Sequence, residues 1–424
     1  MKSGFIDVPI TRQLKLTQHV AAPMNLFSML KLVACLGLFL PVLHAAEKED
    51  AEDHRAWQHG VELLKLNGKD LLIWSSWGNP PTAKPDQDNW EHDIYYAWVD
   101  SCANNISLPA LLVGGHEAQE PPSAAVNNRG KLLVTWEDGT HGINQYAAFW
   151  DGSAPQANKK FLIAAGGHSG HVAASRDRFL VTYSEDWVDA QDGFLGLGTG
   201  KHLRARIVED DGRTGPEIRI SSGTLEKRED WPVVAGSDKG WMIAWQRYPQ
   251  RTLQTVVIDH AGAILQRTLI AKDLRVGYHY DVQYLPALKA YLVLATTTTG
   301  GVAVLMDVHG QIIARNDDLP PLVSESRFVW TAGPAGIIGV YPTMPSGIAV
   351  IQVSTEKITL QKTLASDFQW DYIGTTGTFV SASQVLFATL STEGLKMFTF
   401  NLAEPTFVVH SNAQRCTTAD NSGP

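Results

Sequence analysis

Residues 204–246 read RARIVEDDGRTGPEIRISSGTLEKREDWPVVAGSDKGWMIAWQ, and this stretch decides the fold. It contains a strand, an Asp-Gly turn, a second short strand, a polar loop, the small-residue strand PVVA and the apolar strand WMIAW. Short strands joined by turns rich in Gly and Asp are typical of β-hairpins. The stretch therefore predicts antiparallel structure in which a strand of small residues precedes a strongly apolar one.

The apolar strand recurs seven times, at intervals of roughly 50 residues, which is the spacing of propeller blades. The seven copies are Leu71–Trp74, Leu132–Trp136, Phe179–Tyr183, Trp241–Trp245, Tyr291–Ala295, Ile337–Tyr341 and Val385–Thr389. A small-residue strand precedes each copy and a hairpin follows it, so each repeat holds four antiparallel strands. The chain is therefore predicted to be all-β, a seven-bladed β-propeller, because a β-sandwich has only about seven strands in total.

The order of strands and turns in residues 204–246 resembles the repeats of secreted bacterial propellers distantly similar to the sialidase superfamily. The resemblance covers residues 57–409 and implies the propeller fold. The sequence holds neither the Arg-Ile-Pro signature of sialidases nor a complete Ser-x-Asp-x-Gly-x-x-Trp box. The resemblance therefore implies no sialidase site residue and no sialidase activity.

The composition is that of a folded, acidic protein. The 424 residues are 44% hydrophobic and 19% charged, which excludes a disordered chain. The formal net charge of −9 argues against a broad basic face for nucleic acid or for an anionic membrane. We expect no nucleic-acid partner, and we expect the protein to be a monomer.

The apolar run LVACLGLFLPVLHAA at residues 32–46 is too short to span a membrane but fits a secretory signal. We predict an N-terminal leader with a signal peptide over 1–46, a charged linker over 47–56, the propeller over 57–410 and a polar tail over 411–424. The protein is then periplasmic or secreted, with no transmembrane span once the leader is removed. Lipoprotein processing at Cys35 is the alternative.

Export leaves two cysteines, Cys102 and Cys416. Cys102 follows the third strand of the first repeat, and Cys416 follows the last strand of the chain, so ring closure brings both near each other. In an oxidising compartment we predict a disulfide between them. Two buried free thiols are the alternative.

Ring-bearing and charged residues stand where the chain enters the innermost strand of each blade or loops over the same face. The candidate ligand-binding residues are His141, Arg228, Asp230, Trp231, Tyr278, His279, Arg327, Trp330, Trp370 and Tyr372. Aromatic rings stack on sugars, while Arg, His and carboxylates bind hydroxyl or acidic groups. We therefore predict a site for a carbohydrate or another small polar ligand, with Arg327 as a clamp for an acidic group. Packing between blades is the alternative for the aromatic residues.

Two catalytic chemistries fit this face. Some seven-bladed polysaccharide lyases use His and Tyr here, and His168, His171 and Tyr280 are the similar residues of this chain. In such a reaction Tyr or His takes a proton beside a sugar carboxylate that an Arg neutralises, which favours an acidic polysaccharide. A glycoside hydrolase instead needs two carboxylates, for which the candidates are Glu117, Glu120, Asp230, Asp281 and Asp371.

No cofactor is expected, although three histidines leave one metal alternative. His141, His168 and His171 are of the residue type that binds divalent metals, but imidazoles on loops are also commonly hydrogen-bonded or solvated. The glycine-rich stretch at 193–200 lacks the helix and the lysine of a phosphate-binding loop. The sequence thus favours an exported propeller that binds, and in the enzymatic case cleaves, a carbohydrate. A protein-interaction propeller of the cell envelope and a purely structural ring are the alternatives.

Overall fold

The structure is a computed structural model. It describes residues 58–76, 92–99, 106–115, 118–139, 143–154, 156–157, 159–188, 199–224, 226–334, 336–365, 370, 374–391, 394–403 and 407–410. The predicted leader, linker and tail lie outside the described residues, and so do Cys102 and Cys416.

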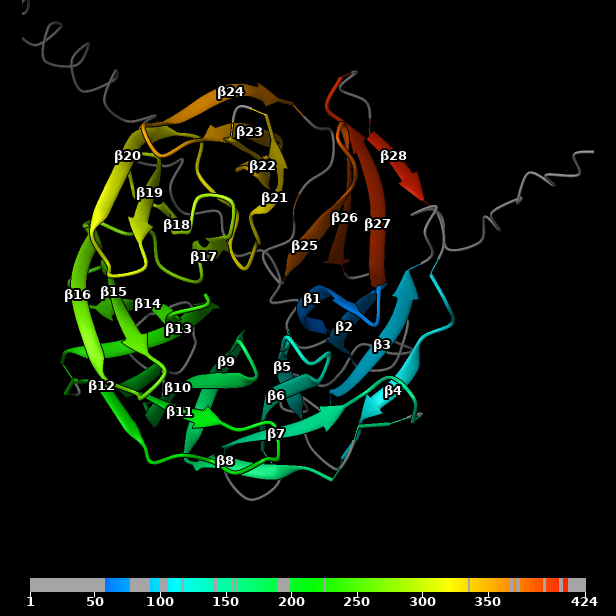
Figure 1. Ribbon diagram of the computed structural model, residues 1–424, viewed down its shortest axis with the longest axis vertical. Helices are drawn as coiled ribbons and strands as arrows, with labels where there is room; N and C mark the ends of the chain where they lie inside the picture. The colour runs from blue at the N-terminus through cyan, green and yellow to red at the C-terminus, as the bar shows by residue number, and fades with distance from the viewer. Residues whose placement is uncertain are drawn as a thin grey trace, which may run out of the picture. The chain divides into compact units, whose positions relative to one another are not determined.

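The described residues form seven antiparallel sheets of four strands, and each sheet is made of strands that are consecutive in the sequence (Figure 1). The strands are β1(Gln58–Leu66), β2(Lys69–Ser76), β3(Asp93–Val99) and β4(Ala110–Val113); β5(Gln119–Val126), β6(Leu132–Asp138), β7(Asn144–Trp150) and β8(Phe161–Ala165); β9(Gly167–Ser175), β10(Arg178–Val188), β11(Thr199–Val208) and β12(Ile218–Ser222); β13(Arg228–Gly236), β14(Gly240–Tyr248), β15(Thr252–Asp259) and β16(Ile264–Ala271); β17(Tyr280–Leu285), β18(Ala290–Thr296), β19(Gly301–Asp307) and β20(Ile312–Leu319); β21(Val329–Gly333), β22(Gly336–Pro342), β23(Ile348–Val353) and β24(Ile358–Leu364); and β25(Thr375–Ser381), β26(Gln384–Ser391), β27(Gly394–Asn401) and β28(Phe407–His410).

These sheets are the seven blades of a β-propeller, as the sequence predicts. The first strand of each blade lies nearest the centre of the ring, and Figure 1 shows β1, β5, β9, β13, β17, β21 and β25 around it. The seven apolar copies are the second strands, β2, β6, β10, β14, β18, β22 and β26. The innermost strands and the outer hairpins also lie where the repeat pattern places them.

The outer hairpins of the fourth and fifth blades are closed by the same kind of turn. Asp259 Oδ1 accepts the N–H groups of Ala261 at 2.9 Å and Ala263 at 2.8 Å, and Asp307 repeats this with its own turn. Gly262 and Gly310 occupy these turns with φ of 84° and 86°. Only glycine adopts this conformation without strain, so the turn chemistry fixes where each hairpin reverses.

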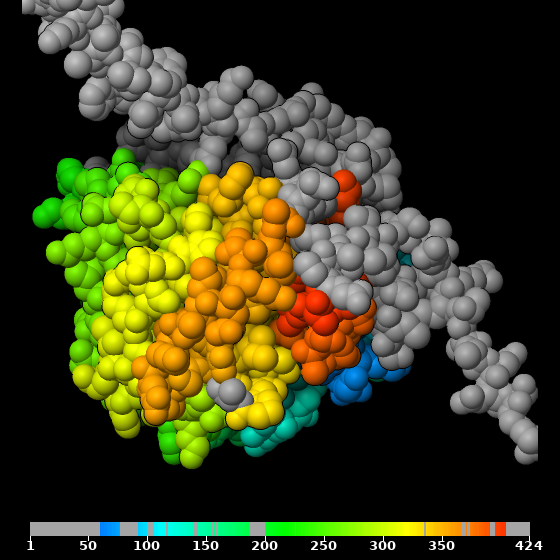
Figure 2. Space-filling view, turned by 90° about the horizontal axis from the view of Figure 1, so that it is seen from above, coloured from blue at the N-terminus to red at the C-terminus, as the bar shows by residue number. Residues whose placement is uncertain are grey.

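The core is divided among seven apolar clusters, each between two neighbouring blades. Trp74, Trp136, Trp241 and Trp245 of the second strands are all fully buried in these clusters. The cluster that closes the ring joins Leu72 and Trp74 of the first blade to Leu386 and Ala388 of the last. Figure 2 shows the last blade, in red and orange, beside the blue first blade.

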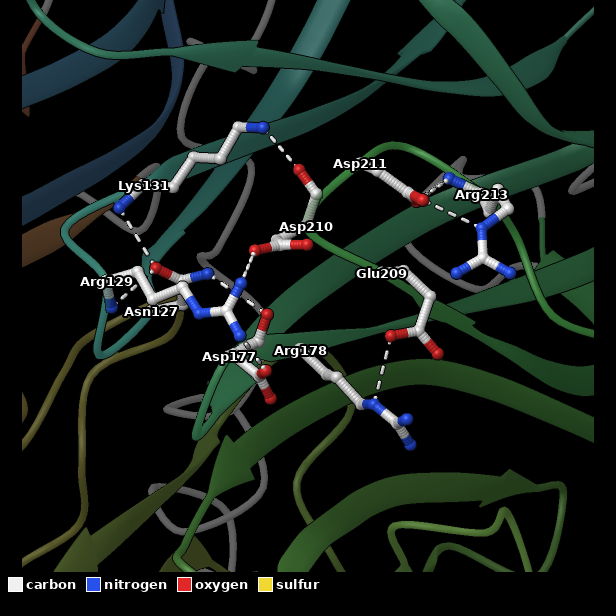
Figure 3. Close-up of polar contacts among 9 residues, drawn as sticks. All are labelled: Asn127, Arg129, Lys131, Asp177, Arg178, Glu209, Asp210, Asp211 and Arg213. Atoms are coloured by element: carbon white, nitrogen blue, oxygen red, sulfur yellow. Dashed lines mark hydrogen bonds and ion pairs between the residues drawn. The ribbon is translucent and has the colours of Figure 1, made fainter.

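The turns at one end of the ring are joined by charges. Arg129, on the turn between β5 and β6, donates to Asp177 Oδ2 at 2.7 Å and also pairs with Asp210 of the β11–β12 turn (Figure 3). Arg178 pairs with Glu209 at 3.0 Å. These pairs lie near the surface, so each stabilises the fold by about 1 kcal/mol or less. The Arg129 pairs hold the turns of the second and third blades together, whereas the Arg178–Glu209 pair lies within the third blade.

None of the described residues forms a helix with the length and apolarity needed to cross a membrane.

Candidate functional site

The innermost strands of the first four blades are bulged near their first residues. The pairing with the second strand shifts after His59, Glu120, His168 and Asp230. At the bulges Gly60, Ser169 and Trp231 have φ of 71°, 51° and 54°. A bulge changes the direction of the side chains around it. It therefore decides which side chains face the opening at this end of the channel, which we call the mouth.

A small cavity of about 40 Å³ lies at the mouth. We call it the mouth cavity. Its polar lining residues are Glu62, His171, Tyr278, Tyr280, Glu325, Ser326 and Arg327. They come from β1, β9, β17 and the connections that precede β17 and β21. The structure thus brings together four residues predicted from the sequence, and adds Glu62 and Glu325, which the sequence analysis missed.

Aromatic rings pack tightly at one side of the mouth cavity. Trp231 stacks on Tyr278 with ring centres 5.2 Å apart, and the His171 ring lies 5.6 Å from Tyr278. Trp231 is buried, whereas His171 and Tyr278 are partly exposed. Burial raises the pKa of Tyr278 well above its ordinary value, and a hydrogen bond with Ser169 opposes the shift. Tyr278 therefore presents a protonated hydroxyl near neutral pH.

Tyr280 joins two blades. Its hydroxyl donates to the main-chain carbonyl of Trp231 in the preceding blade, and its side chain is buried. Burial raises the pKa of Tyr280 well above the ordinary value. The phenol is therefore a hydrogen-bond donor within the fold, and a catalytic role for it stays a prediction.

Arg327 is held by carboxylates from two other blades. Its Nη1 lies 3.0 Å from Asp281 Oδ1, and its Nη2 lies 2.7 Å from Glu62 Oε1. Burial lowers the pKa of Arg327, but the two carboxylates outweigh burial and raise it. The other oxygen of Asp281 accepts the main-chain N–H of Phe328 at 2.9 Å. The guanidinium is thus already neutralised, and its role as a clamp for an acidic ligand stays a prediction.

His168 and His279 are deeply buried. Burial lowers the pKa of each to about 3, so both rings are neutral at physiological pH. His168 Nδ1 lies 3.1 Å from Ser169 Oγ. His279 Nδ1 donates to the carbonyl of Leu322 at 3.2 Å. Both histidines thus contact neighbouring protein groups rather than bulk water.

The remaining candidates occupy different surroundings. Arg228 is buried with its guanidinium 4.6 Å from the centre of the Tyr248 ring, and Asp230 is fully buried. Trp370 packs against Phe398 and donates Nε1–H to the Gly347 carbonyl at 2.9 Å. Trp330 lines the channel below the mouth. His141 and Tyr372 lie outside the described residues.

Two carboxylates proposed for hydrolase or ligand chemistry have partners in the fold. Glu120 contacts Nδ1 of the fully buried His92. Asp281 is bound to Arg327, as described above. Glu117 and Asp371 lie outside the described residues. Among the residues that the structure does describe, no three His, Cys, Asp or Glu side chains are grouped to hold a metal ion.

Comparison with known proteins gives a likeness in fold only. No family model and no curated protein matches the chain. An ulvan lyase, described as a new family of polysaccharide lyase, is 11% identical with a TM-score of 0.49, and the match covers 82% of this chain and 95% of that one. The intramolecular trans-sialidase of Ruminococcus gnavus is 10% identical with a TM-score of 0.44, and the match covers 82% and 95%.

A lectin, SapL1, solved with α-methyl fucoside, is 9% identical with a TM-score of 0.42, and the match covers 74% of this chain and 98% of that one. The chain is a seven-bladed β-propeller, and its structural neighbours at low identity include sialidases and polysaccharide lyases.

Proposed function

We propose that the mouth binds a carbohydrate. The observation that carries this proposal is the convergence of His171, Tyr278 and Glu325 from separate blades on one cavity. All three are partly exposed. An imidazole, a phenol and a carboxylate together offer the donors and acceptors that hydroxyl groups require.

The size of the mouth cavity limits what enters it. Small-molecule sites commonly measure about 300 to 1,000 Å³, far more than the 40 Å³ found here. The cavity therefore accepts a single substituent, such as a hydroxymethyl group, while the rest of the sugar lies outside it.

The charges at the mouth favour a neutral sugar over an acidic one. Glu62, Asp281 and Glu325 lie near a single guanidinium, that of Arg327, which is already in two ion pairs. A ligand carboxylate would meet a surplus of negative charge. We therefore propose a neutral sugar as the ligand. The alternative is an acidic polysaccharide, which the sequence favours because of Arg327.

A glycan array with neutral and uronic-acid glycans tests the proposal. We expect His171→Ala and Glu325→Gln each to weaken binding about tenfold, the loss of one good hydrogen bond to a polar ligand. Glu356→Gln and His309→Ala, on exposed turns, are the matched controls. If no glycan binds, the carbohydrate proposal fails and a protein-interaction propeller is favoured.

The enzymatic alternative needs a separate assay. Incubation with uronic-acid polysaccharides, followed by ultraviolet absorbance of unsaturated products, detects a lyase, and reducing-sugar release detects a hydrolase. Product that disappears in the His171→Ala variant assigns a catalytic role to this residue. Binding without product identifies a binding protein.

We also propose that the protein is exported to the periplasm or beyond. The support is the apolar run at residues 32–46 with Lys31 before it and small residues at its end. N-terminal sequencing of the protein recovered from its native compartment tests this, because cleavage after Ala45 or Ala46 is expected. An intact leader on the mature protein contradicts it.

A further inference from the structure

Beyond Arg327 the channel widens into a second cavity of about 450 Å³, which we call the channel cavity. Its wall takes residues from the innermost strand of every blade, and many are small, such as Ala125, Ala173 and Gly377. Pro286, on the turn after β17, also lines it, so the cavity reaches the end of the ring opposite the mouth. Its volume lies within the range of about 300 to 1,000 Å³ that suits small ligands.

The wall of the channel cavity is more polar than its side chains indicate. Apart from Thr375 of β25, which also pairs with Ser326, the innermost strands have ladder partners on one side only, the second strand of their own blade. Their other edge, which carries main-chain N–H and C=O groups, faces the channel. Small side chains leave these groups within reach of a ligand.

The inner end of the channel cavity carries more negative than positive charge. Glu62 and Arg327 both line it, and Asp281 shares the same guanidinium. Two carboxylates thus face one cation. Glu62 Oε1 accepts hydrogen bonds from Arg327 Nη2 at 2.7 Å and from the Ser123 hydroxyl at 3.4 Å. Within the described residues, the other carboxylate oxygen, Oε2, is therefore left for another partner. Burial raises the pKa of Glu62, the cost of holding this charge away from water.

Aromatic residues line the same cavity. Trp330 and Tyr284 are both among its lining residues. The Tyr284 hydroxyl donates to Asp238 Oδ1 at 3.3 Å, which fixes the ring at the far end of the channel. A carboxylate together with aromatic rings is the combination that recognises substituted ammonium groups, because the ring faces carry partial negative charge.

We propose that the channel cavity binds a small organic cation, an ammonium group with apolar substituents. The cation enters from the end opposite the mouth, passes Tyr284 and places its substituted ammonium group beside Glu62 and Trp330. This site opens at the other end of the channel and does not depend on carbohydrate binding at the mouth, although Glu62 and Arg327 line both cavities. The bound charge balances the second carboxylate of the Glu62–Arg327–Asp281 group.

Isothermal titration calorimetry of the full chain with choline tests this proposal, and the neutral isostere 3,3-dimethyl-1-butanol is the matched ligand. We expect choline to bind saturably and the alcohol to bind at least about tenfold more weakly. Glu62→Gln should lower choline affinity by about the same factor, because it keeps the shape and removes the charge. Choline affinity should rise with pH, because Glu62 ionises as pH rises. The charged groups that face Glu62 are Arg327 and Asp281.

Two further variants keep the test decisive. Trp330→Leu should weaken choline binding while leaving Glu62 and Arg327 in place. This variant tests the proposal even if Glu62→Gln does not fold. Glu356→Gln, on an exposed turn, should bind choline as the wild type does. Absence of saturable choline binding, equal binding of the alcohol, or unchanged affinity in both Glu62→Gln and Trp330→Leu overturns the proposal.

Discussion

Individual side chains near the mouth stabilise the fold, in addition to any contact they make with a ligand. Arg327 connects the sixth blade to Asp281 of the fifth and Glu62 of the first. Tyr280 and Trp370 each donate a hydrogen bond to a main-chain carbonyl. These contacts explain why ring-bearing and charged residues cluster where the innermost strands begin.

Replacing Arg327 with alanine should lower stability substantially. The change leaves Glu62 and Asp281 facing each other without a cation, and breaking a buried ion pair costs about 3 to 5 kcal/mol. Since 21% of the arginine side chain is exposed, we expect about 2 to 4 kcal/mol in urea unfolding. Arg213→Ala, at a fully exposed ion pair, should change stability far less. Equal effects of the two variants would show that the Glu62–Arg327–Asp281 group does not stabilise the fold.

The buried His279 should make the fold sensitive to acid. Burial, with a contribution from Arg275, lowers its folded pKa to about 3 from 6.5. The unfolded chain therefore binds a proton that the folded one does not, and stability is lost as pH falls from 6.5 toward 3. We expect His279→Gln to lose less stability between pH 7 and pH 5 than the wild type does. His309→Gln, at an exposed turn, is the control, and parallel curves for His279→Gln and wild type contradict the prediction.

At the scale of strands, neighbouring blades are joined by side chains that donate to main-chain carbonyls. Trp241 Nε1 donates to Ala173 at 3.0 Å, and the Tyr341 hydroxyl donates to Pro320 at 3.1 Å. On the outer strands Arg315 donates to Ile270 at 2.7 Å. The strand ladders all lie within single blades. These side-chain bonds, the apolar clusters and a few main-chain bonds, such as Asn128 N–H to the Arg176 carbonyl at 2.8 Å, therefore connect the blades.

Tyr341→Phe isolates one such bond. The ring stays and the hydroxyl is lost, which leaves the Pro320 carbonyl without its donor. We expect a loss of about 1 to 2 kcal/mol in urea unfolding, with glycan binding unchanged. Tyr96→Phe, whose hydroxyl has no hydrogen-bond partner among the described residues, should change stability little. A Tyr341→Phe protein as stable as the wild type would remove this bond from the account of blade docking.

The strands could be predicted from the sequence because their signal is repeated seven times, and each copy supports the others. The candidate site could be predicted only in part. An aromatic residue before an innermost strand suits either a ligand site or a contact between blades, so Trp370 and Tyr278 look alike in the sequence but differ in the fold. The bulges make the site harder still to predict, because they change which residues face the mouth.

Glu62 was missed, although a signal for it exists. Glu62 pairs with Ile73, which precedes Trp74, and His171 pairs with Thr182, which precedes Tyr183. The two residues therefore hold the same position in their blades, and both line the mouth cavity. Aligning the innermost strands through their second strands would have shown a carboxylate and an imidazole at one level of the ring.

For the whole molecule, the junction of the first and last blades is the one place where neighbouring blades do not follow each other along the chain. Both blades consist of consecutive strands, so the ring closes through the cluster around Trp74 and Leu386 and through the Arg327–Glu62 pair. The predicted Cys102–Cys416 disulfide would add a covalent link there. Mass spectrometry of unreduced peptides tests it, and two free thiols in protein from an oxidising compartment refute it.

Leu386→Ala tests the apolar part of this junction. The side chain is fully buried, so the cavity should cost about 2 to 5 kcal/mol. Leu292→Ala, fully buried between the fifth and sixth blades, is the matched control. In hydrogen exchange we expect Leu386→Ala to expose amides of β1 and β26, and Leu292→Ala to expose those of β18 and β22. Identical exchange patterns contradict a distinct closing junction.

The arrangement of each blade from four consecutive strands has a consequence for synthesis. Every backbone ladder joins residues close in sequence, and contacts of this kind form early and fast. A nascent chain can therefore complete one sheet before the next has left the ribosome, adding blades in order. The last step alone waits for the finished polypeptide, because β26 must exist before the first blade can find its final neighbour.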